Sequence, residues 1–298
     1  MPMNQVLCST GAFLGKANHN DFRLMKHYAE LLRCDGFELM IGSSWHSQME
    51  EMLETVKSFE LNIPVVHANK SLGEYLCGMT RTYDNGHFNE YFMTDTEEQV
   101  LFEKGTELFL LNLKAAKELK APKMVLHLWN GVASDRRLDK NIKRFGAWKK
   151  MAEEAGVDLL VENVICNVHD PLSNMNRVAD SYDDAHFVYD TKMAEFHAQT
   201  LQLFDEPNLR LLKEGRIRHL HVNDYGGGYK DWSHMEILPI GSGHIDFDSF
   251  FRKLFEYGYH GDYTVETTAL DDNGNVDVDM LNGCFDKIRE YISTQKEI

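Results

Sequence analysis

The 298-residue sequence lacks the features that mark disulfide-stabilised and membrane-spanning proteins. No apolar run approaches the ~20 residues of a membrane span, and the N-terminus lacks the pattern of a secretory signal. The cysteines contain no CxxC pair and no even framework. They are Cys8, Cys34, Cys77, Cys166 and Cys284. Scattered cysteines of this kind are typical of reduced core residues, so we expect a cytoplasmic protein with no membrane partner.

Clusters of positive charge are absent as well. The formal net charge is −16, and no lysine- or arginine-rich run occurs. Nucleic-acid-binding surfaces concentrate positive charge against phosphate, so we expect no nucleic-acid partner. A small polar or metal-chelated substrate fits this composition better.

The sequence does contain a repeated pattern of apolar runs that end on a residue able to bind a metal. Residues 157–164 are aliphatic and β-branched, with Glu162 near the downstream end. Residues 185–189, 217–220 and 263–265 follow the same pattern, as do residues 63–66 and 123–126 earlier in the chain. The metal-binding residues that end these runs are His67, His127, Glu162, Asp190, His221 and Glu266. If the strands are parallel neighbours, these side chains converge.

Eight strand-like runs alternate with eight helix-like runs, and no linker or composition shift divides the chain. The strands are predicted at residues 5–9, 37–41, 63–67, 123–127, 157–164, 186–190, 217–222 and 263–266. One closed (β/α)8 TIM barrel, a single domain over residues 1–298, explains this order. An open doubly wound sheet is the weaker alternative, because residues 10–15 are not a GxGxxG fingerprint. A polar insertion at residues 71–89 is predicted to form a substrate loop.

Glu162, Asp190, His221 and Glu266 come from four consecutive predicted strands. Barrel enzymes keep their catalytic residues at the C-terminal ends of strands, so these four are expected to share one site. Three carboxylates and an imidazole, without thiolate, favour one divalent ion, Mn, Mg, Co or Zn. A cation also relieves the repulsion among the carboxylates. His67 and His127 are left open as substrate contacts, as ligands of a second metal beside Glu162, or as residues that pack against a loop.

The ordered motifs resemble the xylose isomerase-like barrel superfamily, which contains sugar isomerases and epimerases and the endonuclease IV type of nuclease. The resemblance rests on short strings from the fifth to the eighth strand. These are Glu162-Asn163, Asp190, His221-Val-Asn-Asp224, residues 240–246, and residues 258–261 ahead of Thr264-Val-Glu266. The resemblance implies that Glu162, Asp190, His221 and Glu266 are metal ligands. It also implies that Glu162 and Glu266 move the proton in an isomerase or epimerase of a small sugar, inosose or related hydroxy-carbonyl compound.

The sequence departs from the superfamily pattern near the sixth and seventh strands. Many relatives have histidine three residues after the strand-six aspartate, where this chain has Met193, so His197 either fills that role or the contact is lost. Gly226 to Gly228 stand where ketose epimerases often have arginine. Trp129, among other loop aromatics, is a candidate for sugar stacking or for simple packing.

Two alternatives to the isomerase stay open. One is an endonuclease IV-like phosphodiesterase, favoured by His67 and His127, although Asp231 and His234 lack that family's Asp-x-His spacing. The other is a non-catalytic sugar-binding barrel. A small sugar-like molecule is the expected partner in the isomerase hypothesis, and homo-oligomerisation is left open.

Overall fold

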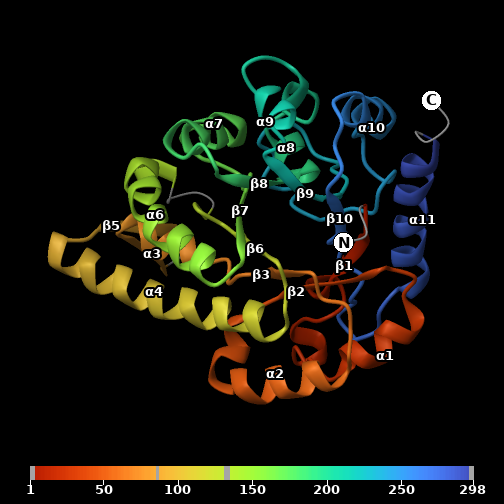
Figure 1. The fold of residues 1–298 in the computed structure, drawn as a ribbon, viewed down its shortest axis with the longest axis horizontal. Helices are drawn as coiled ribbons and strands as arrows, with labels where there is room; N and C mark the ends of the chain where they lie inside the picture. The colour runs from red at the N-terminus through yellow and green to blue at the C-terminus, as the bar shows by residue number, and fades with distance from the viewer. Residues whose placement is uncertain (1–3, 85–86, 131–134, 295–298) are drawn as a thin grey trace.

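The computed structural model describes residues 4–84, 87–130 and 135–294. Eight parallel strands close into a barrel in the order β1-β10-β9-β8-β7-β6-β3-β2 (Figure 1). Their bounds are β1 Val6–Ser9, β2 Gly36–Met40, β3 Val65–His67, β6 Lys123–Leu126, β7 Asp158–Glu162, β8 His186–Asp190, β9 Ile217–His221 and β10 Asp262–Val265. This confirms the (β/α)8 barrel expected from the sequence and excludes the open doubly wound sheet.

Helices surround the barrel on its outside (Figure 1). They are α1 Leu24–Leu31, α2 Met49–Ser58, α3 Leu72–Cys77, α4 Asp95–Glu118, α6 Leu138–Glu154, α7 Pro171–Ser181, α8 Thr191–Phe196, α9 Arg210–Lys213, α10 Phe247–Glu256 and α11 Val278–Thr294. Within the described ranges, no helix has both the length and the apolar character needed to cross a membrane.

Local capping residues explain where two of the longer helices begin. Thr94 and Glu97 form the capping box of α4, each side chain bonding the other's backbone N–H. Asp246 caps α10 by accepting from the backbone N–H of Ser249. Each cap gives a hydrogen-bond acceptor to a free N–H of the first turn, so the helix begins at the residue after the cap.

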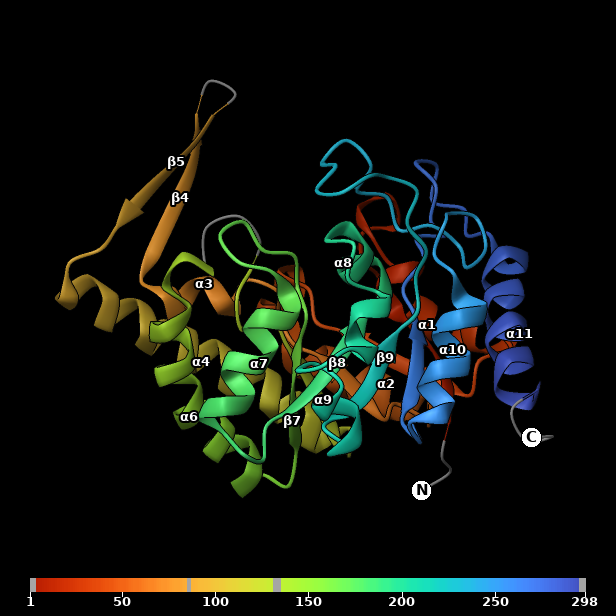
Figure 2. The same cartoon turned by 90° about the horizontal axis from the view of Figure 1, so that it is seen from above.

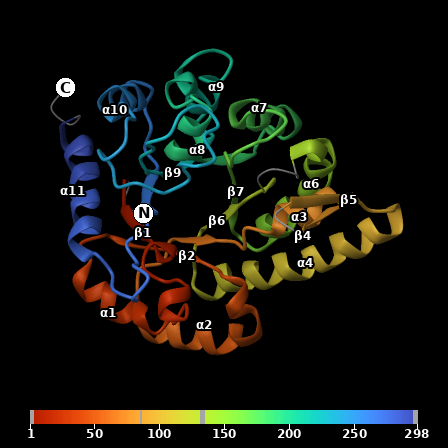
Figure 3. The same cartoon turned by 180° about the vertical axis from the view of Figure 1, so that it is seen from behind.

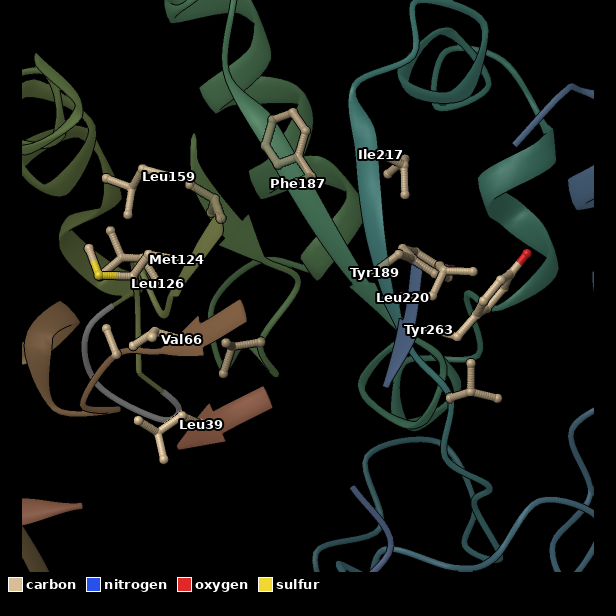
Figure 4. Packing of buried hydrophobic residues seen from close by; sticks show 14 of the residues in the cluster. Leu39, Val66, Met124, Leu126, Leu159, Phe187, Tyr189, Ile217, Leu220 and Tyr263 are labelled. Carbon is tan, nitrogen blue, oxygen red and sulfur yellow. The ribbon is translucent and has the colours of Figure 1, made fainter. Parts of the chain in front are cut away.

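Strand alternation separates the barrel interior from the layer under the helices. The interior holds a small apolar cluster: Leu7, Val65, Val125, Leu160 and Val188. The residues between them along the strands point outward and pack under the helices, as Leu159, Phe187 and Leu220 do in Figure 4. Side chains two residues apart on a strand point to the same face. A polar residue two positions from a member of this cluster therefore also points into the barrel.

The polar insertion at residues 71–89 differs from the expected loop. It contains α3 and most of an antiparallel hairpin of β4 Met79–Asp84 and β5 His87–Phe92, with residues 85–86 outside the described ranges. Figure 2 shows this hairpin projecting away from the body of the barrel. Threonine, tyrosine and phenylalanine favour strands, and in residues 79–92 this preference outweighed the polar composition.

The two ends of the chain meet on the barrel. β1 pairs with β10, and α11 lies beside the α1 region (Figures 1 and 3). Asn282 of α11 accepts from the backbone N–H of Arg33 at 2.7 Å and donates to the carbonyl of Leu31 at 3.1 Å. Contacts between distant parts of the sequence therefore close the barrel at this seam.

Candidate metal centre

Four polar side chains converge at the C-terminal ends of four neighbouring strands. Glu162, Asp190 and His221 end β7, β8 and β9, and Glu266 follows β10 directly. Glu162 is two residues beyond Leu160, and Asp190 is two residues beyond Val188, so alternation points both into the barrel. One ligand atom from each of the four lies within 4.8 Å of the others, and all four residues are buried.

The imidazole of His221 stands among the three carboxylates. Its Nδ1 lies 3.4 Å from Oε1 of Glu162, 3.3 Å from Oε2 of Glu266 and 3.9 Å from Oδ2 of Asp190. Nδ1 of His221 and Oε1 of Glu266 are buried without a hydrogen-bond partner. Buried polar atoms are rarely left unpaired, so these lone pairs fit a shared ligand. Three carboxylates and one imidazole suit a divalent cation such as Mn, Mg, Co or Zn.

Two asparagines fix the orientation of the carboxylates. Asn223 donates to Oδ2 of Asp190 at 3.1 Å and accepts from the backbone N–H of Glu266 at 3.0 Å. Asn163 brackets the backbone of Asp190, accepting from its N–H at 2.5 Å and donating to its carbonyl at 3.0 Å. The backbone N–H of Met193 donates to Oδ1 of Asp190 at 2.7 Å, as the cap of α8. Supporting contacts of this kind hold ligands in place.

The pKa values in the site reflect crowding of negative charge. Burial, together with Glu266 and Glu162, raises the pKa of Asp190 to about 7. Burial alone lowers the pKa of His221, yet the charges of Glu266, Glu38 and Glu162 raise it well above its ordinary value. Positive charge is therefore favoured at this point, whether it comes from a proton on His221 or from a cation.

His67 and His127 form a second group on the other oxygen of Glu162. Nε2 of His67 lies 3.2 Å and Nε2 of His127 lies 2.8 Å from Oε2 of Glu162, and all three residues are buried. Nδ1 of His67 is 2.9 Å from the carbonyl of Ala68, so in the neutral ring Nδ1 carries the proton. Nε2 then faces Oε2 of Glu162 with a lone pair, and only a second proton or a cation can bridge these two acceptors. The structure thus places both histidines beside Glu162, in a second candidate cation group that shares Glu162 with the first.

Trp129 and His197 lie outside the candidate cation groups of the described residues. The buried indole of Trp129 donates to the carbonyl of Val164 at 2.7 Å. Nε2 of His197 accepts from the backbone N–H of Cys166 at 3.1 Å. Burial, with Lys230 nearby, lowers the pKa of His197 to about 4. A substrate contact through either residue stays a prediction.

Sequence reasoning missed Glu38, His219 and Thr264, which lie inside the barrel beneath His221. Glu38 is fully buried in the middle of β2 and contacts both histidines. The signal was present, because a carboxylate stands inside the apolar run at residues 37–41. Glu38 stands in the middle of its strand, whereas the pattern of metal-binding residues lies at strand ends.

The solved structures that are similar in fold include the following three. A D-tagatose 3-epimerase-like protein has a TM-score of 0.64 at 18% identity, covering 98% of this chain and 98% of its own. The D-allulose 3-epimerase from Methylomonas sp. has a TM-score of 0.66 at 15% identity, covering 99% and 98%. The IOLI protein, solved with a zinc atom, has a TM-score of 0.60 at 13% identity, covering 98% and 97%. At such low identity these likenesses establish the fold.

Sequence comparison identifies the family directly. No curated protein matches the chain. A family model for the xylose isomerase-like TIM barrel matches residues 28–282, which is most of the sequence and includes all four residues that converge at the strand ends. The chain therefore belongs to the xylose isomerase-like TIM barrel family.

Proposed function

We propose that the protein is a cytoplasmic, divalent-metal-dependent isomerase or epimerase of a small sugar, inosose or related hydroxy-carbonyl compound. The observation that carries the proposal is the convergence of Glu162, Asp190, His221 and Glu266 on one buried point. The shared fold of the two epimerase structures supports the reaction class, and the zinc atom of the IOLI structure supports a resident cation.

The four converging residues would hold the cation, and Glu162 and Glu266 would also move the proton. When bound, a divalent cation polarises carbonyl and hydroxyl oxygens and acidifies the adjacent C–H. Glu162 and Glu266 approach Nδ1 of His221 from β7 and from the end of β10, two strands that are separated by β8 and β9. Because they come from different sides, one can remove a proton from a substrate carbon while the other returns it.

The surrounding residues have proposed roles in binding. His67 and His127 would contact substrate or hold a second cation with Glu162, whose Oε2 they both face. Trp129 and His197 would support the residues that contact substrate or cation, since each forms a hydrogen bond with a backbone group of the loop after β7.

The test begins with the metal content of the purified protein. Deuterium exchange from solvent into a panel of ketoses and inososes then identifies the chemistry. Glu162→Gln and Glu266→Gln should each lower exchange by about 10²- to 10⁴-fold, the usual contribution of general acid–base catalysis. Glu153→Gln, on the exposed face of α6, is the matched control and should leave exchange unchanged. Exchange that survives both active-site changes would refute the proposed roles. Sugar binding without exchange in the unmodified protein would indicate a binding barrel instead.

A metal-dependent phosphodiesterase is the second candidate, favoured by the separate group of His67, His127 and Glu162. The net charge of −16 opposes it, and His234 pairs with Asp231 at 2.7 Å on an exposed loop. A nuclease of this kind should bind duplex DNA containing an abasic site with a steep salt dependence. We expect no such binding at 100 mM salt, and tight binding there would favour the nuclease.

A further inference from the structure

Glu38 lies inside the barrel directly beneath the candidate metal centre and has no role in the proton transfer proposed above. It is fully buried on β2, and alternation turns it inward because Leu39 packs outward. Its carboxylate oxygens lie 3.1 and 3.2 Å from Nε2 of His221. Oε2 lies 3.0 Å from Nε2 of His219 and 2.8 Å from the hydroxyl of Thr264. One buried carboxylate therefore meets three buried polar groups.

Counting donors fixes the proton positions. An ionised carboxylate only accepts, so each of its three neighbours must donate to it. His221 and His219 then carry a proton on Nε2, and the hydroxyl of Thr264 points at Oε2. With Nε2 of His221 engaged in this way, its remaining nitrogen, Nδ1, is the atom that faces Glu162 and Glu266. In the neutral ring, Nδ1 therefore has a free lone pair directed into the metal centre.

We infer that Glu38 is a positioning residue that holds His221 in the Nε2–H tautomer and in the orientation that presents Nδ1 to a divalent cation. The inference rests on the proposed metal centre and extends it to a residue outside the four proposed ligands. His219 and Thr264 act one layer further out, since their bonds fix the carboxylate of Glu38. Carboxylates that orient ligating histidines commonly change metal affinity about 10- to 100-fold when altered.

Glu38→Gln tests this role with nearly the same shape. The amide presents one acceptor oxygen and one donor group, so it cannot accept from all three neighbours. If the amide donates to Nε2 of His221, the proton moves to Nδ1 and blocks the cation. We expect the dissociation constant for Mn²⁺ or Co²⁺, measured by calorimetry, to rise about 10- to 100-fold. Thr264→Val is the matched control, because it removes the hydroxyl's contacts with Glu38 and with Nε2 of His219 but leaves the bond between Glu38 and His221. Its metal affinity should change less than about 5-fold.

A second measurement uses the unaltered protein and so does not depend on the folding of a variant. In the zinc-loaded protein, ¹⁵N NMR of His221 should show metal on Nδ1 and a hydrogen-bonded proton on Nε2. Metal on Nε2 would overturn the inference, as would a Glu38→Gln variant that folds and binds cation as tightly as the unaltered protein. An unaltered protein that binds no divalent cation would refute the metal centre itself, which separates the two failures.

Discussion

The two ends of the barrel both carry buried or half-buried charge but arrange it differently. At the N-terminal ends of the strands, Nζ of Lys123 lies 2.8 Å from Oδ2 of Asp262, whose Oδ1 accepts from the backbone N–H of Gln5 at 2.9 Å. His186 and Asp158 pair at 2.7 Å. At the opposite end, carboxylates crowd around His221, whose Nδ1 has no hydrogen-bond partner.

The charges at the N-terminal end of the sheet are arranged to stabilise the fold. The charges at the C-terminal end are arranged in a way that costs stability and suits a functional site. Pairing each charge with an opposite partner stabilises the fold, whereas crowding like charges around free lone pairs destabilises it. The raised pKa of Asp190, about 7, is the electrostatic sign of that cost. Barrel enzymes keep their chemistry at the C-terminal face, and the arrangement here follows that division.

Adding a cation should produce the largest change in the free energy of unfolding. It should do so by binding at the C-terminal end of the barrel alone. Mn²⁺ at about 1,000 times its dissociation constant should raise the free energy of unfolding by about 4 kcal/mol, because it binds the folded state and relieves carboxylate repulsion. Denaturant unfolding with Mn²⁺ and with a chelator measures this. The Glu162→Gln variant should lose most of the response. An equal response in that variant would place the ion elsewhere.

Removing a charge from the N-terminal end should lower stability and spare the metal centre. Lys123→Met leaves Asp262 with one of its two partners, so the free energy of unfolding should fall by about 2 kcal/mol. Lys57→Met breaks the exposed pair with Glu118 and should cost under about 1 kcal/mol. Denaturant midpoints and the Mn²⁺ dissociation constant should be measured for both. A changed metal affinity in Lys123→Met would show that the two ends are coupled.

Substitution of His197 tests whether a buried histidine on the C-terminal side of the barrel makes the stability of the fold depend on pH. Its pKa is about 4 in the fold and about 6.5 in an unfolded chain, so the unfolded state gains a proton first as pH falls. Its contribution is therefore fully present above pH 6.5 and is lost as pH falls towards 4. His197→Gln keeps an acceptor for the N–H of Cys166 and removes the titration. Between pH 7 and 5 it should lose about 2 kcal/mol less stability than the unaltered protein.

Denaturation at the two pH values, on chelator-treated protein, measures this difference. His186→Gln is the comparison variant, because His186 pairs with Asp158 at the N-terminal end. If His197→Gln and the unaltered protein lose the same stability on acidification, the titration of His197 does not contribute to acid sensitivity.

The strands were predicted closely because hydrophobic runs dominate their sequences. The predicted strand at residues 186–190 matches β8. Thr94-Asp-Thr-Glu97 is a capping-box pattern that can be recognised from the sequence, and α4 begins directly after Thr94. The hairpin β4–β5 was missed because its polar composition resembles a loop, and its strands gain their structure by pairing with each other. The sequence pattern also predicts a helical segment from about residue 195 to 213 with a break near Pro207. The structure has three short segments there instead: α8, a 3₁₀ turn Leu201–Phe204 and α9.

The site was partly predictable for the same reason. Glu162, Asp190 and His221 stand at the ends of apolar runs, so parallel strands bring them together. His197 carried no such signal, and its ring turned towards the backbone of Cys166. Glu38 was missed because its partners, His219 and Thr264, are 181 and 226 residues away in the sequence.

The sequence by itself determined the alternation of strands and helices and the residue that ends each strand, because hydrophobic period and chain order are local properties. Only the closed barrel decided which polar side chains share an interior, which nitrogen of His221 faces the carboxylates and which charges find partners. Those outcomes depend on strand register and on distances between residues that are far apart in the chain, and a linear pattern contains neither.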